Sequence, residues 1–214
     1  MIVEDQRLFR DLLKRSLASV PHLNVVGDVG DGAAAVQLAR KLKPDVVLMD
    51  IELGQEPNGI TSGVRIKEEN PNIGIVLLTT HDEKEYLSAV PLEQSQGWSY
   101  VLKQSVADLP TLVRAIEGAA SGLLVLDPSV VKHLRPRPSS RINRLTPRQH
   151  EVLDLIAQGF SNDGIAQQLF LSGKAVENHI KSIYENLNIG RDEPIHPRVK
   201  AVLVYLNESS GKAL

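Results

Sequence analysis

Short apolar runs alternate with amphipathic stretches along the first half of the chain. The stretches between the runs repeat apolar residues every three or four positions, which predicts helices. Strands this short and apolar, separated by helices, predict a doubly wound parallel α/β sheet of five strands that is buried on both faces. The runs that predict strands lie at residues 2–3, 25–26, 46–49, 73–78 and 100–102.

The second half of the chain shows helical spacing and no strand-like run. Thr146 and Gln149 can form a capping box, with Pro147 at the first helical position. Ser161 and Ser172 are expected to cap two further helices. The helix after Ser172 has an apolar seam and a polar face, which fits the recognition element of a helix-turn-helix, although spacing alone is more typical of an ordinary surface helix. The seam consists of Val176, Ile180, Ile183 and Leu187.

The length of 214 residues fits two domains of about 100 residues each. We expect the α/β domain over residues 1–121 and a small all-α domain over residues 144–214. Residues 122–143 are expected to link them through a short helix at 127–134. The Pro-, Arg- and Ser-rich residues 135–141 then predict an extended, exposed tether.

Composition excludes several classes of protein. The chain has no cysteine, which excludes a disulfide scaffold, a zinc ribbon and thiol catalysis, and which agrees with a reducing cytoplasm. No apolar run approaches the roughly 20 residues of a membrane span, and no signal-peptide pattern opens the chain. We therefore expect a cytoplasmic protein without a membrane partner. Three Phe, four Tyr and one Trp are too few for a platform that stacks single-stranded bases.

Charge is distributed unevenly. Residues 1–121 hold 12 basic and 17 acidic side chains, whereas residues 122–144 hold five basic and one acidic. Residues 145–214 are nearly balanced, with seven basic and eight acidic. An acidic front, a basic hinge and a near-neutral back suggest modules with separate tasks.

Polar residues follow the ends of the predicted strands. In a doubly wound sheet, ligands bind beyond the carboxyl ends of the strands, so these side chains are expected to share one crevice. Three carboxylates at one edge repel each other unless a hard cation such as Mg²⁺ joins them. A phosphoryl group on Asp50 would then be neutralised by the metal and Lys103 and would accept a hydrogen bond from Thr79. The polar residues are Glu4, Asp5, Asp50, Thr79, Thr80 and Lys103.

Four segments resemble the receiver domain of two-component response regulators, and the match spans nearly all of residues 1–121. They are Ile-Val-Glu-Asp-Gln at 2–6, Pro-Asp-Val-Val-Leu-Met-Asp-Ile at 44–51, Leu-Leu-Thr-Thr at 77–80 and Tyr-Val-Leu-Lys at 100–103. The resemblance implies that Asp50 accepts a phosphoryl group from a histidine kinase. It also implies that Lys103 binds this group and that Thr79 and Tyr100 are the switch pair. The implied Mg²⁺ ligands are Glu4, Asp5, Asp50 and the backbone carbonyl of Glu52.

Several features depart from the receiver pattern, and two of them are single residues. Thr80 is bulkier than the small residue usual after the switch threonine, so it is expected to slow the access of water and hence dephosphorylation. Pro91 falls where the family has a fourth helix, which is therefore expected to be short or broken.

Four segments of the second half resemble the LuxR-type helix-turn-helix, and the two resemblances together indicate a NarL/FixJ-type response regulator. The segments are Leu-Thr-Pro-Arg-Gln-His-Glu-Val-Leu at 145–153, Ile-Ala-Gln-Gly-Phe-Ser-Asn at 156–162, Ile-Ala-Gln-Gln-Leu-Phe-Leu-Ser at 165–172 and Ala-Val-Glu-Asn-His-Ile at 175–180. By this resemblance Glu177, Asn178 and Lys181 face base edges, and Ser172 and Lys174 contact phosphates. The helix of the family that dimerises carries Val199, Val202, Leu203 and Leu206 here.

The electrostatics of the predicted recognition helix favour a dimer. Lys174 and Lys181 are balanced by Glu177 and Glu185, so residues 172–185 carry no net charge. One such domain should bind DNA weakly, and a homodimer on two half-sites doubles the number of phosphate contacts.

The sequence thus indicates a transcription factor that a histidine kinase phosphorylates at Asp50. Its expected partners are double-stranded promoter DNA, a second copy of the chain and RNA polymerase. The only catalysis expected is its own phosphoryl transfer and dephosphorylation. One alternative is a regulator that works without phosphorylation. Another is an aspartyl-phosphate phosphatase of the haloacid dehalogenase kind, which needs an Asp two residues after the nucleophile, where this chain has Glu52.

Overall fold

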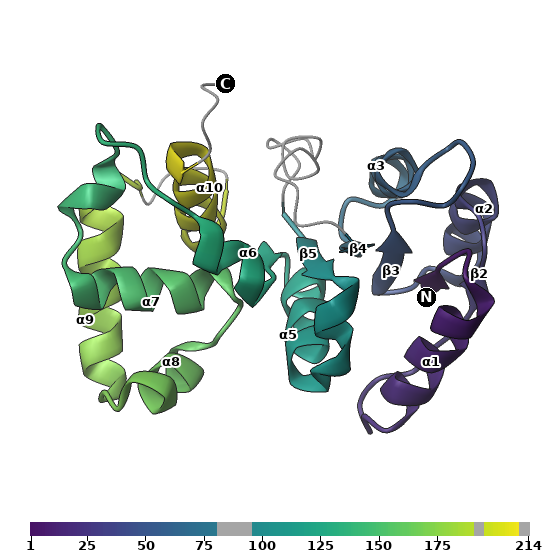
Figure 1. Cartoon of the computed structure of the whole chain (residues 1–214), viewed down its shortest axis with the longest axis horizontal. Coiled ribbons are helices and arrows are strands. Elements are labelled where there is room, and N and C mark those ends of the chain that lie inside the picture. The colour runs from purple at the N-terminus through teal and green to yellow at the C-terminus, as the bar shows by residue number, and fades with distance from the viewer. Residues whose placement is uncertain (81–95, 191–194, 210–214) are drawn as a thin grey trace.

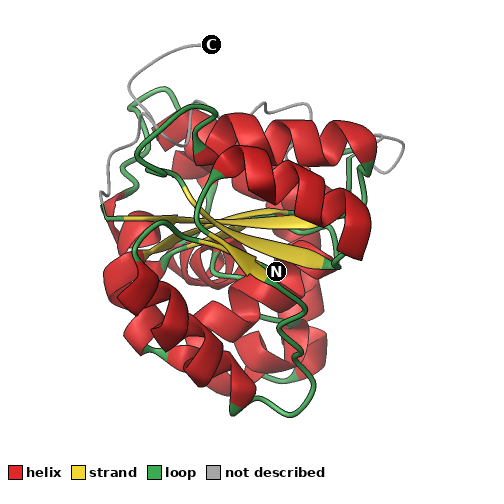
Figure 2. Cartoon of the chain, turned by 90° about the vertical axis from the view of Figure 1, so that its right-hand side faces the viewer, coloured by secondary structure: helices red, strands yellow, loops and turns green. Residues whose placement is uncertain are grey.

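The computed structural model describes residues 1–80, 96–190 and 195–209. A parallel sheet with strand order β2-β1-β3-β4-β5-β6 forms the centre of the first half. Figure 2 views this sheet close to edge-on and shows helices above and below it. The predicted doubly wound fold is therefore confirmed. The strands are β1 Ile2–Val3, β2 Asp28–Val29, β3 Val46–Asp50, β4 Gly74–Thr79, β5 Trp98–Leu102 and β6 Val125–Leu126.

Helices cover both faces of the sheet because each carries one apolar stripe. Leu13 and Leu17 of α1 pack with Leu112 and Ile116 of α5 in one buried cluster, whereas Ala35 of α2 belongs to the other. None of the helices in the described part of the chain has the length and apolarity that a membrane span requires. The predicted fourth helix, with Pro91, lies outside the described residues. The helices are α1 Arg7–Ala18, α2 Gly32–Leu42, α3 Gly59–Glu69 and α5 Leu109–Ala120, and a 3₁₀ turn, η2, spans Lys103–Ala107.

Two strand predictions need correction. The sheet has six strands and not five, because β6 adds to the edge of β5 with Ser99 opposite Val125 and Tyr100 opposite Leu126. This sixth strand lies in residues 122–143, the predicted linker. The second strand is Asp28–Val29 and not residues 25–26, because Asp28 pairs with Ile2 of the very short β1.

The second half is all-helical, as predicted. Thr146 and Gln149 form the expected capping box, and Ser161 and Ser172 cap the next two helices. The predicted apolar seam of the third helix is buried, with Val176, Ile180, Ile183 and Leu187 at most 9% exposed. The helices are α7 Pro147–Ala157, α8 Asn162–Leu169, α9 Gly173–Asn186 and α10 Pro197–Ser209, preceded by a 3₁₀ turn, η3, at Arg141–Arg144.

The linker is more ordered than the sequence suggested. The predicted short helix is present as α6, Pro128–His133. The tether after it is not freely exposed, because the Glu208 carboxylate accepts hydrogen bonds from Ser140 Oγ at 2.7 Å and from Arg141 N and Nε, both at 2.6 Å. The Glu208 backbone carbonyl also accepts from Arg137 N–H at 2.9 Å. An acidic side chain near the end of α10 thus fixes a basic tether against that helix.

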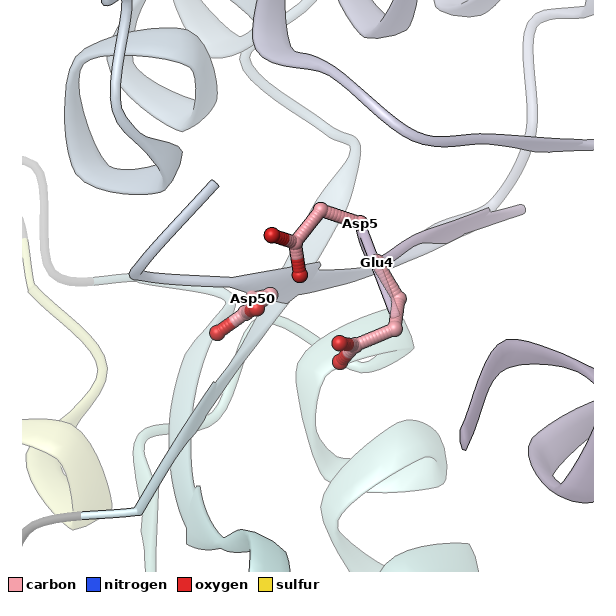
Figure 3. A group of neighbouring side chains, drawn as sticks. All are labelled: Glu4, Asp5 and Asp50. Carbon is pink, nitrogen blue, oxygen red and sulfur yellow. The ribbon is translucent and has the colours of Figure 1, made fainter. Parts of the chain in front are cut away.

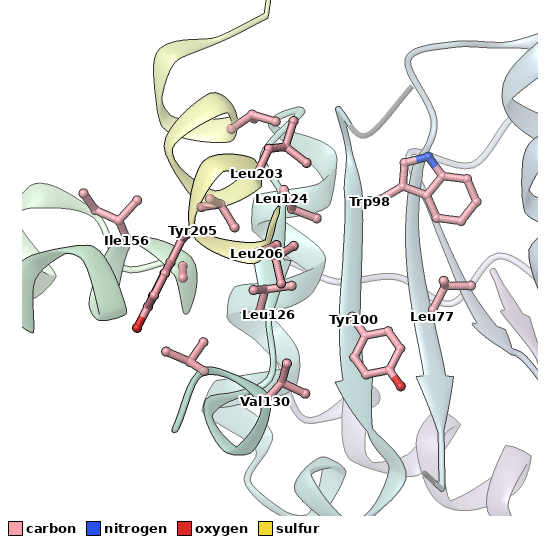
Figure 4. Close-up of a cluster of buried hydrophobic side chains, with 14 of the residues drawn as sticks. Leu77, Trp98, Tyr100, Leu124, Leu126, Val130, Ile156, Leu203, Tyr205 and Leu206 are labelled. Carbon is pink, nitrogen blue, oxygen red and sulfur yellow. The ribbon is translucent and has the colours of Figure 1, made fainter. Parts of the chain in front are cut away.

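One apolar core runs through both halves of the molecule. Leu124, Leu126 and Val130 of the linker region share a buried cluster with Leu203 and Leu206 of α10 (Figure 4). Figure 1 shows α6 and α10 between the sheet and the remaining helices of the second half. The two halves are therefore docked through α10.

Candidate functional site

Parallel strands bring the predicted polar residues to one edge of the sheet. Glu4 directly follows β1, Asp50 and Thr79 end β3 and β4, and Lys103 directly follows β5. These strands run in the same direction, so their carboxyl ends meet at the same edge. The predicted convergence of these side chains is therefore what the fold produces.

Three carboxylates form a compact group at this edge (Figure 3). Glu4, Asp5 and Asp50 each offer an oxygen atom, and these oxygens lie within 4.8 Å of one another. Asp5 is exposed, whereas Glu4 and Asp50 are 0% and 1% exposed. Glu4 Oε2 is buried and lies 2.9 Å from the Lys103 ammonium, so this oxygen already faces a cation. A set of carboxylate oxygens with one side open to water fits Mg²⁺, which prefers oxygen ligands and retains several waters.

Lys103 balances part of this negative charge. Its Nζ lies 2.9 Å from Asp50 Oδ2 and donates to Glu4 Oε1 at 3.0 Å. Burial raises the pKa of Glu4 to about 7 and also raises the pKa of Asp50, although the hydrogen bonds from Lys103 oppose both shifts. Burial alone would lower the pKa of Lys103, but its bonds to Asp50 and Glu4 raise it overall. The ammonium is therefore firmly charged and placed beside the predicted acceptor oxygen.

The remaining predicted residues lie at the end of β4, on β5 and in the loop that follows Asp50. Asp50 Oδ1 accepts from Glu52 N–H at 3.1 Å, which fixes the carboxylate and the start of the following loop. Thr79 and Tyr100 are buried, and Thr80 is exposed. Thr80 Oγ1 donates to Glu52 Oε2 at 3.3 Å, so these two side chains are joined beside the group of Glu4, Asp5, Asp50 and Lys103, which we call the pocket.

Gly59 is a residue of this site that sequence reasoning missed. A Cβ at Gly59 would overlap the carbonyl oxygen of Asp50 and would lie 2.9 Å from Ile51 Cα. Gly59 N–H also donates to the Ile51 carbonyl at 3.0 Å. The Asn58-Gly59 pair is a turn signal that could have pointed to this close approach. Only glycine lets α3 begin directly against the loop that carries Asp50.

Replacing Gly59 by Ala is expected to lower the free energy of unfolding by about 2 kcal/mol, the cost typical of an overpacked site. The new Cβ would displace the backbone of Asp50. The rate at which acetyl phosphate transfers a labelled phosphoryl group to Asp50 should therefore also fall. Urea unfolding and labelling rates measure the two effects. Gly173→Ala is the control, because nothing lies within 4 Å of a Cβ there and alanine favours a helix. Equal stability of G59A and the unaltered chain would contradict this account.

The second predicted site lies on α9. Ser172 accepts from Ala175 N–H at 3.2 Å and so caps the helix, and the predicted DNA-contacting side chains after it are exposed. Lys174 Nζ lies 3.1 Å from Glu177 Oε2, so the carboxylate partly neutralises that lysine. Helices α7 and α8 pack against α9, which lies in Figure 1 on the side of the molecule away from the sheet. The exposed predicted residues are Ser172, Lys174, Glu177, Asn178 and Lys181.

The predicted dimerisation residues are not at the surface. All four are at most 6% exposed, because α10 packs against α7 on one side and belongs to the buried cluster of the linker region. In this docked arrangement a second copy of the chain cannot reach them. The residues are Val199, Val202, Leu203 and Leu206.

Comparison with known proteins agrees with this geometry. The "Response regulator receiver domain" family matches residues 1–117, and "Bacterial regulatory proteins, luxR family" matches residues 143–195. The transcriptional regulatory protein DegU of Brevibacillus brevis is 32% identical over 88% of this chain and 87% of its own length. The nitrate/nitrite response regulator protein NarP of Escherichia coli is 32% identical over 99% of this chain and 96% of its own length.

Solved structures of one further protein are similar over nearly the whole chain. One is a structure of RcsB of Salmonella typhimurium that concerns its conformational dynamism for DNA interaction. It has a TM-score of 0.54 at 30% identity and covers 96% of this chain and 97% of its own. A structure of two RcsB dimers bound to two parallel DNAs has a TM-score of 0.53 at 29% identity, with coverage of 98% and 97%. The protein therefore belongs to the NarL/FixJ-type response regulators, in which a receiver domain is followed by a LuxR-type DNA-binding domain.

Proposed function

We propose that this response regulator binds promoter DNA in response to phosphorylation of Asp50 by a histidine kinase. The observation that carries the proposal is the contact of Lys103 Nζ with Asp50 Oδ2, at 2.9 Å, inside a cluster of carboxylates at the sheet edge. A phosphatase of the haloacid dehalogenase kind is not favoured, because both matched families describe regulators.

The phosphoryl transfer would proceed by attack of an Asp50 oxygen on the phosphorus of a phosphohistidine. A P–O bond forms as the P–N bond breaks, and the electron pair of that bond leaves with the imidazole of the kinase. Lys103 neutralises charge on the phosphoryl oxygens, and Thr79 donates a hydrogen bond to one of them. Magnesium held by Glu4, Asp5, Asp50 and the carbonyl of Glu52 would supply further neutralising charge. Tyr100, buried on the strand that precedes Lys103, would complete the switch pair.

Incubation with acetyl phosphate and magnesium tests the proposal. Stable label on Asp50 together with tighter DNA binding would support it. Rapid release of free phosphate with turnover would support the phosphatase instead. DNA binding that is unchanged, with no label on Asp50, would support a regulator that works without phosphorylation.

Replacing Thr80 by Ala is expected to shorten the lifetime of the phosphorylated protein about fivefold, which corresponds to an activation free energy of hydrolysis lower by ~1 kcal/mol. Thr80 Oγ1 bonds to Glu52 Oε2 beside the pocket, and the smaller side chain would let water approach the phosphoryl group. Loss of label over time measures the lifetime. Glu52→Gln is the control, because it keeps an acceptor oxygen for Thr80 Oγ1 and leaves the size of Thr80 unchanged. An unchanged lifetime in T80A would count against a barrier at this position.

For DNA binding we propose that Glu177, Asn178 and Lys181 face bases and that Ser172 and Lys174 contact phosphates. All five are exposed, Ser172 at the N-cap of α9 and the others on the helix, and the dimers on DNA of the similar protein RcsB also support this assignment. A promoter-bound regulator works beside the chromosome, so the proposal places it in the cytoplasm, where RNA polymerase would be a further partner.

Asn178→Ala is expected to weaken binding to the operator by about 1–3 kcal/mol and to remove the preference at one base pair. Lys174→Ala should instead weaken binding to every sequence and reduce the salt slope of log K by about 1. Titrations of operator and scrambled DNA at several salt concentrations separate the two effects. Lys41→Ala, an exposed lysine on α2, is the control. Identical behaviour of the Asn178 and Lys174 variants would contradict the assigned roles.

We further propose that the DNA-bound form is a homodimer that pairs through Val199, Val202, Leu203 and Leu206. These side chains are buried in the docked chain, so pairing requires that α10 leaves the linker region. A phosphoryl group on Asp50 would favour that release by stabilising the undocked state relative to the docked one.

A further inference from the structure

Asp127 is a buried carboxylate that the proposed chemistry does not use. It is 0% exposed and lies where β6 ends and α6 begins. A buried carboxylate is costly unless its oxygens are hydrogen-bonded, so its partners indicate why the position holds an acid. Those partners lie on two different elements.

The Asp127 carboxylate completes the ladder between β5 and β6. Asp127 N–H donates to the Tyr100 carbonyl at 2.7 Å, and in a parallel ladder the next bond would run from Leu102 N–H to the Asp127 carbonyl. That carbonyl instead accepts from Val131 N–H at 3.0 Å, because the chain turns into α6 at this residue. Asp127 Oδ2 takes its place and accepts from Leu102 N–H at 3.0 Å. Oδ1 accepts from Ser129 N–H at 2.8 Å and caps α6.

These two hydrogen bonds connect the phosphorylation pocket with the docked helix. Leu102 directly precedes Lys103, whose ammonium contacts Asp50 at 2.9 Å. Ser129 lies in the first turn of α6, and Val130 of the same helix packs in the buried cluster that includes α10. One side chain therefore holds the end of β5 with one oxygen and the start of α6 with the other.

We propose that Asp127 is a positioning residue that couples phosphorylation of Asp50 to the docking of α10; this inference rests on the proposed function. A phosphoryl group gives the Lys103 ammonium a new partner, and the backbone next to it is the one that Asp127 holds. Movement of Leu102 N–H away from Oδ2 would leave a buried carboxylate oxygen unpaired, so Asp127 and the start of α6 move with it. Asp127 thus carries a share of the coupling free energy between the two sites.

The test uses Asp127→Ser in the full chain. Serine is a good cap for α6, but its shorter side chain cannot also reach Leu102. The measured quantity is the ratio of DNA affinities with and without phosphorylation by acetyl phosphate and magnesium. We expect this ratio to fall at least about fivefold in D127S while Asp50 still takes up label. Asp31→Ser removes the same side chain from the cap of α2, away from β5, and should keep the ratio of the unaltered chain.

The outcomes are distinct. A folded D127S with an unchanged ratio overturns the inference and leaves the proposed function standing. No gain in DNA affinity on phosphorylation of the unaltered chain overturns both. If D127S does not fold, hydrogen exchange of the unaltered chain decides. Protection of the Leu102 and Ser129 amides should change together on phosphorylation, and a change in only one or neither overturns the coupling.

Discussion

Asp50→Asn is expected to take up no label from acetyl phosphate and magnesium, and to bind DNA equally with and without acetyl phosphate. The amide has nearly the shape of the carboxylate but is not a nucleophile, so the acceptor is lost while the packing remains. Lys103 keeps its ion pair with Glu4, at 2.9 Å from Oε2, so no unpaired buried cation results and the chain should fold. Labelling and DNA titration, with thermal unfolding as a check of folding, measure this result.

Asp45→Asn provides the matched control. Asp45 is an exposed carboxylate directly before the opposite end of β3, so the same change of charge occurs beside the same strand without touching the pocket. This variant should label and bind DNA as the unaltered chain does. Label in D50N at the level of the unaltered chain would mean that another residue is the acceptor. Induction of DNA binding in D50N without label would mean that phosphorylation of Asp50 is not the signal.

The strands that the sequence predicts well are those buried on both faces. Residues 46–49 and 73–78 are apolar without interruption by charge, and a strand buried on both faces leaves this pattern. The sixth strand, Val125–Leu126, is only two residues long, and it becomes a strand because the edge of β5 is free to pair with it. The structure of the tether also depends on a distant partner, because Ser140 donates a hydrogen bond to Glu208, which is 68 positions away. Neither partner can be read from local composition.

The site residues also fall into a group that the sequence predicts and a group that it does not. Glu4, Asp50, Thr79 and Lys103 were predictable together, because parallel strands bring their carboxyl ends to one edge whatever the loops do. Gly59 and Asp127 were not, because their importance depends on which backbone groups lie next to them.

The dimer prediction did not take account of the apolar composition of α10 as a whole. Residues on all its sides are apolar and buried, including Val202, Val204 and Leu206. A helix that is apolar all round needs partners on more than one face, so a single dimer contact could not account for its composition.

Val130→Asp is expected to release α10 and to give DNA binding without phosphorylation. Val130 lies on α6 in the buried cluster of Leu124, Leu126, Leu203 and Leu206, so docking would bury a carboxylate without a partner. In the undocked chain that carboxylate would be in water, so nearly the whole penalty falls on the docking equilibrium. A penalty of about 3 kcal/mol, modest for a buried charge, shifts this equilibrium more than a hundredfold. Sedimentation and DNA titration should show a dimer and an affinity near that of the phosphorylated unaltered chain.

His133→Asp separates this effect from that of added charge. His133 lies three residues further along α6 and is exposed, so the new carboxylate stays in water in both arrangements. This variant should remain a monomer with weak DNA binding until it is phosphorylated. A V130D chain that is folded, undocked by small-angle scattering and still monomeric would show that freeing α10 does not suffice for pairing. The buried residues Val199, Val202, Leu203 and Leu206 would then serve only as core, and the dimer contact would have to lie on another surface, because release would already have exposed this one.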